Sequence, residues 1–201
     1  MKKTIITISR QFGSGGREIG QRLAKELEIP FYDKELIEIA AKQSGIDSEL
    51  FEEERYHTSR GFYLLGAINY TLGSPISSIA EMSLNDRLFF VQSQAIKNIA
   101  EQGSCVLIGR CADYVLNDME HLSVFIHADM ESRKKRAVHS YEVDENDIEA
   151  SIEKIDKRRA NYYNYYTDRI WGAADNYDIV LNSDKFGIDG CVKLLKQLIQ
   201  E

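Results

Sequence analysis

The chain is poor in the residues that stiffen or cross-link a protein, with two prolines, three cysteines and one tryptophan among its 201 residues. Its cysteines, Cys105, Cys111 and Cys191, are odd in number, widely spaced and outside any C-x-x-C or His/Cys ligand pattern. This excludes an ordinary disulfide framework and zinc motif, so we expect reduced thiols in a cytoplasmic protein. Few prolines and a hydrophobic fraction of 43% indicate a folded, largely helical chain.

Long apolar runs and surplus positive charge are also missing. The apolar stretch within MKKTIITISR is short and gives way to Ser9, Arg10 and Gln11, so we expect neither a signal peptide nor a membrane span. A net charge of −7 disfavours general binding to nucleic acid or to an anionic membrane, because both attract clustered Lys and Arg. The length fits one domain, and nothing in the sequence indicates the oligomeric state.

Short apolar segments alternate with amphipathic ones along the chain. Strands are predicted at residues 4–9 and 31–32, within SCVLIGR and HLSVFIHAD, and at 177–182. Helices are predicted at residues 16–28, 34–44, from a cap at Asn85 or Asp86 to Gln102, after Asp129, and at 145–166 and 187–200. This order is typical of an α/β fold, a parallel sheet with helices on both faces that binds ligands at the carboxyl ends of its strands. Residues 49–78 break the pattern and are expected to form a mobile insertion.

A glycine cluster follows the first predicted strand and precedes the first predicted helix. Its glycines allow positive φ and close backbone approach, so successive N–H groups can surround a phosphate at the positive end of a helix dipole. A tight turn without a ligand is the less favoured alternative. The predicted ATP-phosphate-binding residues are Gly13, Ser14, Gly15, Gly16, Arg17 and Glu18.

The cluster departs from the motif G-x-x-x-x-G-K-[ST] at three positions, where it has Gln11, Arg17 and Glu18. Arg17 keeps the positive charge of the motif's lysine and can bridge donor phosphates with its fork of N–H groups. In the motif, the Ser or Thr hydroxyl at the position of Glu18 normally binds Mg²⁺. Glu18 is either a metal ligand or, as we favour, a first-turn acid that complements the helix dipole. No residue is assigned as a metal ligand.

Charged residues after two predicted strands are candidates for binding a phosphate acceptor. Arg110 leaves the carboxyl end of a central strand, where its geometry suits bidentate phosphate recognition, and Asp113 follows it. Pairing of Arg110 with a surface acid is the alternative. Asp33 follows the second strand and could orient a ribose, accept a hydroxyl proton or simply cap a helix.

Two later segments, residues 133–136 and 154–159, are locally basic. Against the negative background, such an excess could neutralise phosphate charge during transfer, and Arg158 and Arg159 are the preferred candidates. Lys134, Lys135 and Lys154 are expected to lie on solvated helix faces, and the tyrosines of NYYNYY to pack rather than stack on a base.

The order of these segments resembles a known family. ITISRQFGSGGREIGQRLA, YDKELIEIA, CVLIGRCADYVL, VFIHADMESRKKRAV, KIDKRRANYYNYY and NYDIVLNS together resemble the cytidylate kinase-like proteins, a branch of the P-loop nucleoside-monophosphate (NMP) kinases. The resemblance spans almost the whole chain and is weakest over residues 48–85. It implies a single three-layer P-loop domain, with its core at residues 1–33, 86–140 and 173–201, an NMP-binding flap near 34–85 and a lid near 141–172.

The resemblance also implies site residues. The acceptor-phosphate arginine corresponds to Arg110, and the usual G-K-G-T ending of the loop reads Gly16-Arg17-Glu18-Ile19 here. The family's Tyr-Arg acceptor pair reads Tyr32-Asp33-Lys34. The catalytic residues implied are Arg17, Arg133, Arg136, Arg158 and Arg159, acting with ATP and Mg²⁺.

These observations lead to one hypothesis and two alternatives. The hypothesis is ATP-dependent phosphoryl transfer to a small acceptor such as CMP, which would give CDP and ADP. The first alternative is a nucleotide-binding or sensing module that kept the loop without turnover. The second, a nucleic-acid-binding protein, is disfavoured by the overall charge. The expected partners are therefore small nucleotides, and neither nucleic acid nor membrane is expected.

Overall fold

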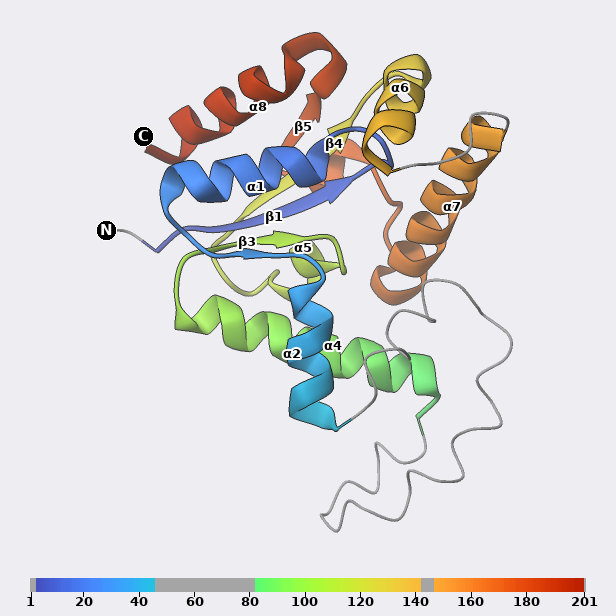
Figure 1. Ribbon diagram of the computed structural model, residues 1–201. Helices are drawn as coiled ribbons and strands as arrows, with labels where there is room; N and C mark the ends of the chain where they lie inside the picture. The colour runs from blue at the N-terminus through green and yellow to red at the C-terminus, as the bar shows by residue number, and fades with distance from the viewer. Residues whose placement is uncertain (1–2, 46–81, 142–146, 201) are drawn as a thin grey trace. The chain divides into compact units, whose positions relative to one another are not determined.

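The computed structural model describes residues 3–45, 82–141 and 147–200 (Figure 1). The insertion predicted at residues 49–78 lies outside these described residues. Along the chain, the elements are β1 (Ile5–Arg10), α1 (Gly16–Leu27), β2 (Phe31–Tyr32), α2 (Glu35–Ser44), α4 (Leu84–Gln102), β3 (Cys105–Ile108), α5 (Ala112–Val115), β4 (Leu122–His127), α6 (Met130–Tyr141), α7 (Ile148–Thr167), the 3₁₀ turn η4 (Ala174–Asn176), β5 (Ile179–Asn182) and α8 (Ser183–Gln200).

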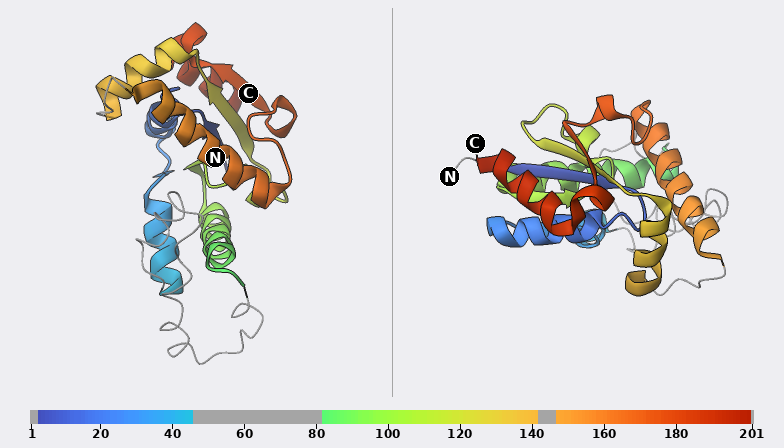
Figure 2. Two further views of the ribbon diagram at one scale, coloured as in Figure 1. Left: turned by 90° about the vertical axis from the view of Figure 1, so that its right-hand side faces the viewer. Right: turned by 90° about the horizontal axis from the view of Figure 1, so that it is seen from above.

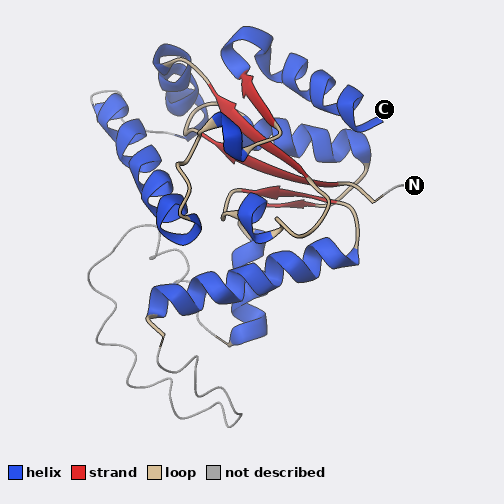
Figure 3. Cartoon of the chain, turned by 180° about the vertical axis from the view of Figure 1, so that it is seen from behind, coloured by secondary structure: helices blue, strands red, loops and turns tan. Residues whose placement is uncertain are grey.

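The described strands form one five-stranded sheet in the order β2-β3-β1-β4-β5 (Figure 3). Every neighbouring pair is parallel, with Ile8 of β1 paired to Ile108 on one side and to Val124 on the other. The central position of β1 explains its nearly uninterrupted apolar sequence, because a central parallel strand is covered on both faces. The predicted parallel α/β fold is confirmed.

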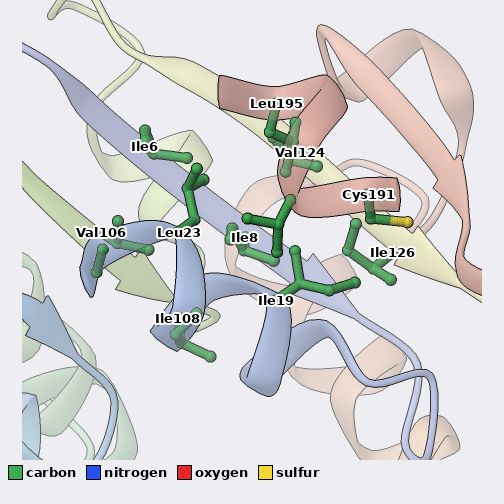
Figure 4. Close-up of a cluster of buried hydrophobic side chains, with 12 residues drawn as sticks. Ile6, Ile8, Ile19, Leu23, Val106, Ile108, Val124, Ile126, Cys191 and Leu195 are labelled. Carbon is green, nitrogen blue, oxygen red and sulfur yellow. The ribbon is translucent and has the colours of Figure 1, made fainter. Parts of the chain in front are cut away.

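The main core lies between the sheet and the helices α1 and α8, which lie on the same side of it (Figure 2, right). Ile6 and Ile8 of β1 point to this side, where Ile19 of α1 and Leu195 of α8 pack against them (Figure 4). Each is essentially inaccessible to solvent, and burying such a side chain contributes about 1.5–3 kcal/mol. Because side chains alternate along a strand, Thr7 points to the opposite face, where α5 packs on β1.

The described contacts divide the chain into two units, Met1–Asp33 with Ile96–Glu201, and Lys34–Ala95. The second unit has its own apolar cluster of Ala40, Leu88 and Ala95. The helix α7, within the predicted lid, belongs to the first unit. The roles of flap and lid stay predictions.

Two helix ends differ from expectation. The cap of α4 is Ser83, whose hydroxyl accepts the Asp86 N–H at 3.2 Å and donates to the Asp86 carboxylate at 2.7 Å. The predicted cap at Asn85 or Asp86 is wrong, because Asp86 is the reciprocal partner at the third helical position. A short helical segment from Ser183 precedes the predicted final helix, and the non-helical backbone of Gly187 (φ 68°, ψ 170°) separates the two parts of α8. None of the described helices has the length and apolarity needed to cross a bilayer.

Candidate functional site

The glycine loop joins β1 to α1 at the carboxyl edge of the sheet, beside α6 and α7 (Figure 1). Gly13 (φ 74°) and Gly15 (φ 78°) both adopt the left-handed conformation. A Cβ atom on Gly13 would lie 2.5 Å from the backbone oxygen of Arg133, so this glycine lets α6 approach the loop. Helix geometry leaves the first N–H groups of α1 without intrahelical acceptors, which suits a phosphate.

Two serine hydroxyl groups, one in the loop and one directly after β5, donate hydrogen bonds to backbone carbonyl groups of the loop. The Ser14 hydroxyl donates to the Gln11 carbonyl at 2.8 Å, closing the turn across its own residues. The hydroxyl of the buried Ser183 donates to the Ser14 carbonyl at 2.6 Å. The carbonyl of Ser14 is therefore engaged by a residue at the start of α8.

Arg17 and Asp33, predicted separately for the donor and the acceptor, lie together. The Arg17 Nε atom donates to Asp33 Oδ2 at 2.7 Å, and Asp33 is only 9% exposed. Arg10, which sequence reasoning did not select, brings its Nη2 atom to 3.6 Å from Asp33 Oδ1. Two guanidinium groups thus share one carboxylate beside the loop, leaving a local positive excess that favours an anionic ligand.

The turn that carries Arg110 has an unusual backbone. Gly109, Arg110 and Cys111 have φ values of 67°, 60° and 54°, three successive residues in the left-handed region. A Cβ atom on Gly109 would lie 2.2 Å from Arg10 Nη1, so the Arg10 guanidinium occupies the space beside this turn. Left-handed non-glycine residues cost of order 1–2 kcal/mol each, and such strain concentrates at functional sites.

Asp113, the other acceptor candidate, is buried rather than open to a ligand. It is 5% exposed, and the Tyr163 hydroxyl of α7 donates to its Oδ2 atom at 2.7 Å. Burial raises the pKa of this carboxyl group above its usual range, with the Tyr163 hydrogen bond acting in the opposite direction. Asp113 therefore joins the Arg110 turn to α7. The burial of Tyr163 confirms the packing predicted for that tyrosine, whereas the prediction is wrong for Tyr165, which is 70% exposed.

The basic residues of α6 and α7 converge on the backbone of the loop. Arg133 Nε donates to the Phe12 carbonyl at 2.8 Å, and Arg136 Nη1 donates to the Gly13 carbonyl at 3.1 Å. From α7, Arg159 Nη1 donates to the Arg10 carbonyl at 3.0 Å. The structure thus brings these arginines to the loop as hydrogen-bond donors to its carbonyl groups. Arg158 precedes Arg159 on α7 and is half-buried.

Asp156 of α7 is a second site residue that sequence reasoning missed. Its Oδ1 atom accepts the Phe12 N–H at 2.7 Å, and its Oδ2 atom contacts Arg133 Nη2. Burial raises the pKa of Asp156, while the Phe12 N–H and Arg133 act against that rise. Its only sequence signal was an acid inside a basic segment, KIDKRR.

The described residues suit donor phosphates better than they suit a loop-held metal. Glu18 is exposed and forms an ion pair with Arg22 at 2.5 Å, which supports its interpretation as a first-turn acid of α1. No group of three His, Cys, Asp or Glu side chains within the described ranges has the geometry of a metal site. The positive-φ glycines and the N-terminus of α1 could surround a phosphate, but the loop residues do not fit the usual Mg²⁺ position.

Comparison with known proteins identifies the family. The sequence model of a protein family, described as the cytidylate kinase-like family, matches residues 5–185. The chain belongs to the cytidylate kinase-like family. This confirms the resemblance drawn from the sequence and indicates a nucleotide or small-molecule kinase at the level of the family.

Solved structures agree with this family's P-loop kinase fold. An uncharacterized protein from Eubacterium ventriosum is 28% identical, with a TM-score of 0.73 and 99% of each chain covered. Shikimate kinase from Bacteroides thetaiotaomicron is 15% identical, with a TM-score of 0.57 over the whole of both chains. Shikimate kinase from Acinetobacter baumannii, solved with shikimate, is 13% identical, with a TM-score of 0.54, covering 99% of this chain and 94% of that one. No curated protein matches this member of the cytidylate kinase-like family.

Proposed function

We propose that this cytidylate kinase-like protein transfers the γ-phosphoryl group of ATP to a nucleoside monophosphate such as CMP, giving CDP and ADP. The observation that carries this proposal is the contact between Arg17 and Asp33, at 2.7 Å, beside the glycine loop. A donor-side cation and an acceptor-side acid meet there, at the carboxyl ends of β1 and β2. Phosphoryl transfer needs such positioning of donor and acceptor next to positive charge.

Each element of the site has a proposed task. The amides of residues 13–18 and the Arg17 guanidinium bind the donor phosphates, and Arg110 binds the acceptor phosphate. Asp33 orients the acceptor when Arg17 turns to the donor, and Asp113 fixes the turn that carries Arg110. Arg133, Arg136, Arg158 and Arg159 supply positive charge from α6 and α7 beside the transferring phosphoryl group.

The wider assignments belong to the same proposal. Residues 34–85 form the NMP-binding flap, and residues 141–172 form the lid. ATP enters with Mg²⁺ carried on its own phosphates, because the loop offers no hydroxyl at Glu18 or Ile19. The free, buried cysteines support a cytoplasmic location. Small nucleotides are the partners, without nucleic acid or membrane.

The test is a coupled assay of ADP release over the nucleoside monophosphates, with ATP and Mg²⁺. Arg17→Ala and Arg110→Ala should each lower kcat/KM about 10- to 100-fold, since each removes a charged hydrogen bond to phosphate. Lys25→Ala is the control, because Lys25 is an exposed cation in the last turn of α1. Absence of ADP release with every acceptor would overturn the proposal.

One observation favours a second candidate, a nucleotide-binding module without turnover. Glu18 replaces the Mg²⁺-binding hydroxyl of the usual motif and is engaged with Arg22 instead. Calorimetric binding of ATP together with no product from any acceptor would support this second function. Multiple turnovers would eliminate it.

A further inference from the structure

The backbone N–H and the backbone carbonyl of Phe12 are both held by residues far along the chain. Its N–H donates to Asp156 Oδ1 at 2.7 Å, and its carbonyl accepts from Arg133 Nε at 2.8 Å. Arg133 and Asp156 also bind each other through Nη2 and Oδ2. Phe12, Arg133 and Asp156 therefore form a closed ring of hydrogen bonds between the loop, α6 and α7.

This ring is largely withdrawn from solvent. The side chains of Arg133 and Asp156 are 7% and 14% exposed. Loss of one partner would leave the other as a buried charge with weakened compensation, so the two hold each other firmly in place. Arg159 adds to the arrangement, because its guanidinium lies 3.7 Å from Asp156 Oδ1 and 5.7 Å from the centre of the Phe12 ring.

The ring fixes the direction of the first amide of the glycine loop. The carbonyl of Phe12 and the N–H of Gly13 belong to one peptide plane, and the described peptide bonds are all trans. In a trans peptide the N–H points opposite to the C=O. Because Arg133 holds the Phe12 carbonyl toward α6, the Gly13 N–H points away from α6.

We propose that Asp156 is a positioning residue that aims the Gly13 N–H at the donor phosphate. It acts through Arg133, which holds the carbonyl of the Phe12–Gly13 peptide group. This inference rests on the proposed function, because it takes the glycine loop as the donor-phosphate site. An amide fixed before the ligand arrives binds charge without a cost of reorganisation. Asp156 itself makes no contact with the nucleotide, and its effect reaches the phosphate through the loop.

A purely structural role for Asp156 predicts a different result. In that case Asp156 only joins α7 to the rest of the unit, and its loss lowers stability without changing nucleotide affinity in the folded protein. Glu149 provides a matched control, because it pairs with Lys134 between the same two helices, α6 and α7. None of the described contacts of Glu149 reaches the loop, so its removal tests the helix junction alone.

The experiment is a calorimetric titration of ADP into wild type, Asp156→Ala, Asp156→Asn and Glu149→Ala, well below each melting temperature. We expect Asp156→Ala to weaken ADP binding about 10- to 100-fold, as misplaced groups do, and Glu149→Ala to stay within about 2-fold. Asp156→Asn keeps an acceptor for the Phe12 N–H but not the charge, so its affinity should be intermediate. In the kinase assay, Asp156→Asn should raise KM for ATP more than KM for the acceptor.

The outcomes separate this inference from the proposed function. Affinity of both Asp156 variants within about 2-fold of wild type, with only a lower melting temperature, would overturn the positioning role. If Asp156→Ala does not fold, the comparison of Asp156→Asn with Glu149→Ala decides. ADP binding without turnover would contradict only the kinase proposal. The ADP affinities of the variants would then still test the positioning role of Asp156. If wild type does not bind ADP, both proposals fail.

Discussion

Gly13→Ala is the substitution whose effect the structure defines most closely. Gly13 has φ of 74°, and a Cβ atom there would lie 2.5 Å from the oxygen and 3.0 Å from the Cα atom of Arg133. Both obstacles are backbone atoms of α6, so no side-chain rotation can relieve them. The methyl group would have to displace α6 from the loop, together with the Arg133 side chain.

The expected loss in the free energy of unfolding has two parts. A non-glycine residue in the left-handed region costs about 1–2 kcal/mol, and overpacking a tight contact costs about 1–3 kcal/mol. We take a central value of about 3 kcal/mol, which for a chain of this size lowers the melting temperature by about 6–12 °C. Nucleotide affinity should fall as well, because the displaced Arg133 no longer holds the Phe12 carbonyl.

Gly15→Ala is the internal control for this prediction. Gly15 has a similar φ of 78°, but the atom nearest to its Cβ position is the terminal Cδ1 of Ile188, at 2.4 Å. That methyl group can rotate away, so the loss should be about 1–2 kcal/mol, the backbone strain alone. Urea unfolding of wild type and both variants measures the difference. Equal losses for the two variants, or no loss for Gly13→Ala, would refute the reasoning.

Two further predictions concern buried titratable groups. Since burial raises the pKa of Asp113 above its ordinary 3.8, its folded state binds the proton more tightly, and the stability it contributes is lost as pH rises through that raised pKa. The melting temperature of Asp113→Asn minus that of wild type should therefore be larger at a pH above that raised pKa than at a pH below 3.8; a pH-independent difference would contradict this. Burial also raises the pKa of Cys105 to about 11, so only about one thiol in a thousand there is ionised near pH 8. A thiol reagent should label Cys105 in native protein far more slowly than in urea, and equal labelling rates would disprove its burial.

Periodicity was sufficient to predict the sheet and most helices. The β-branched run of β1 and the spacing of Ile19, Leu23 and Ala24 on α1 are local signals, and the structure buries those residues together. The glycine loop was equally visible, because Gly13 and Gly15 sit between a strand and a helix and take up positive φ. Such features depend on neighbours in sequence and need no tertiary information.

The missed features depend on contacts between distant residues. Asp156 lies 144 positions from its partner Phe12, and nothing near it in the sequence signals a buried carboxylate. Arg10 ends β1, and its proximity to Gly109 follows only from the pairing of β1 with β3. The left-handed conformations of Arg110 and Cys111 were also unpredictable, because neither residue type favours positive φ.

The most direct test of the central claim is transfer of a radiolabelled γ-phosphoryl group from ATP by the intact protein, with CMP as acceptor. The claim predicts that the label moves into CDP over many turnovers, and that Arg17→Ala slows the transfer while Lys25→Ala does not. Label that stays in ATP, or appears only as inorganic phosphate, with CMP and with every other nucleoside monophosphate would contradict it.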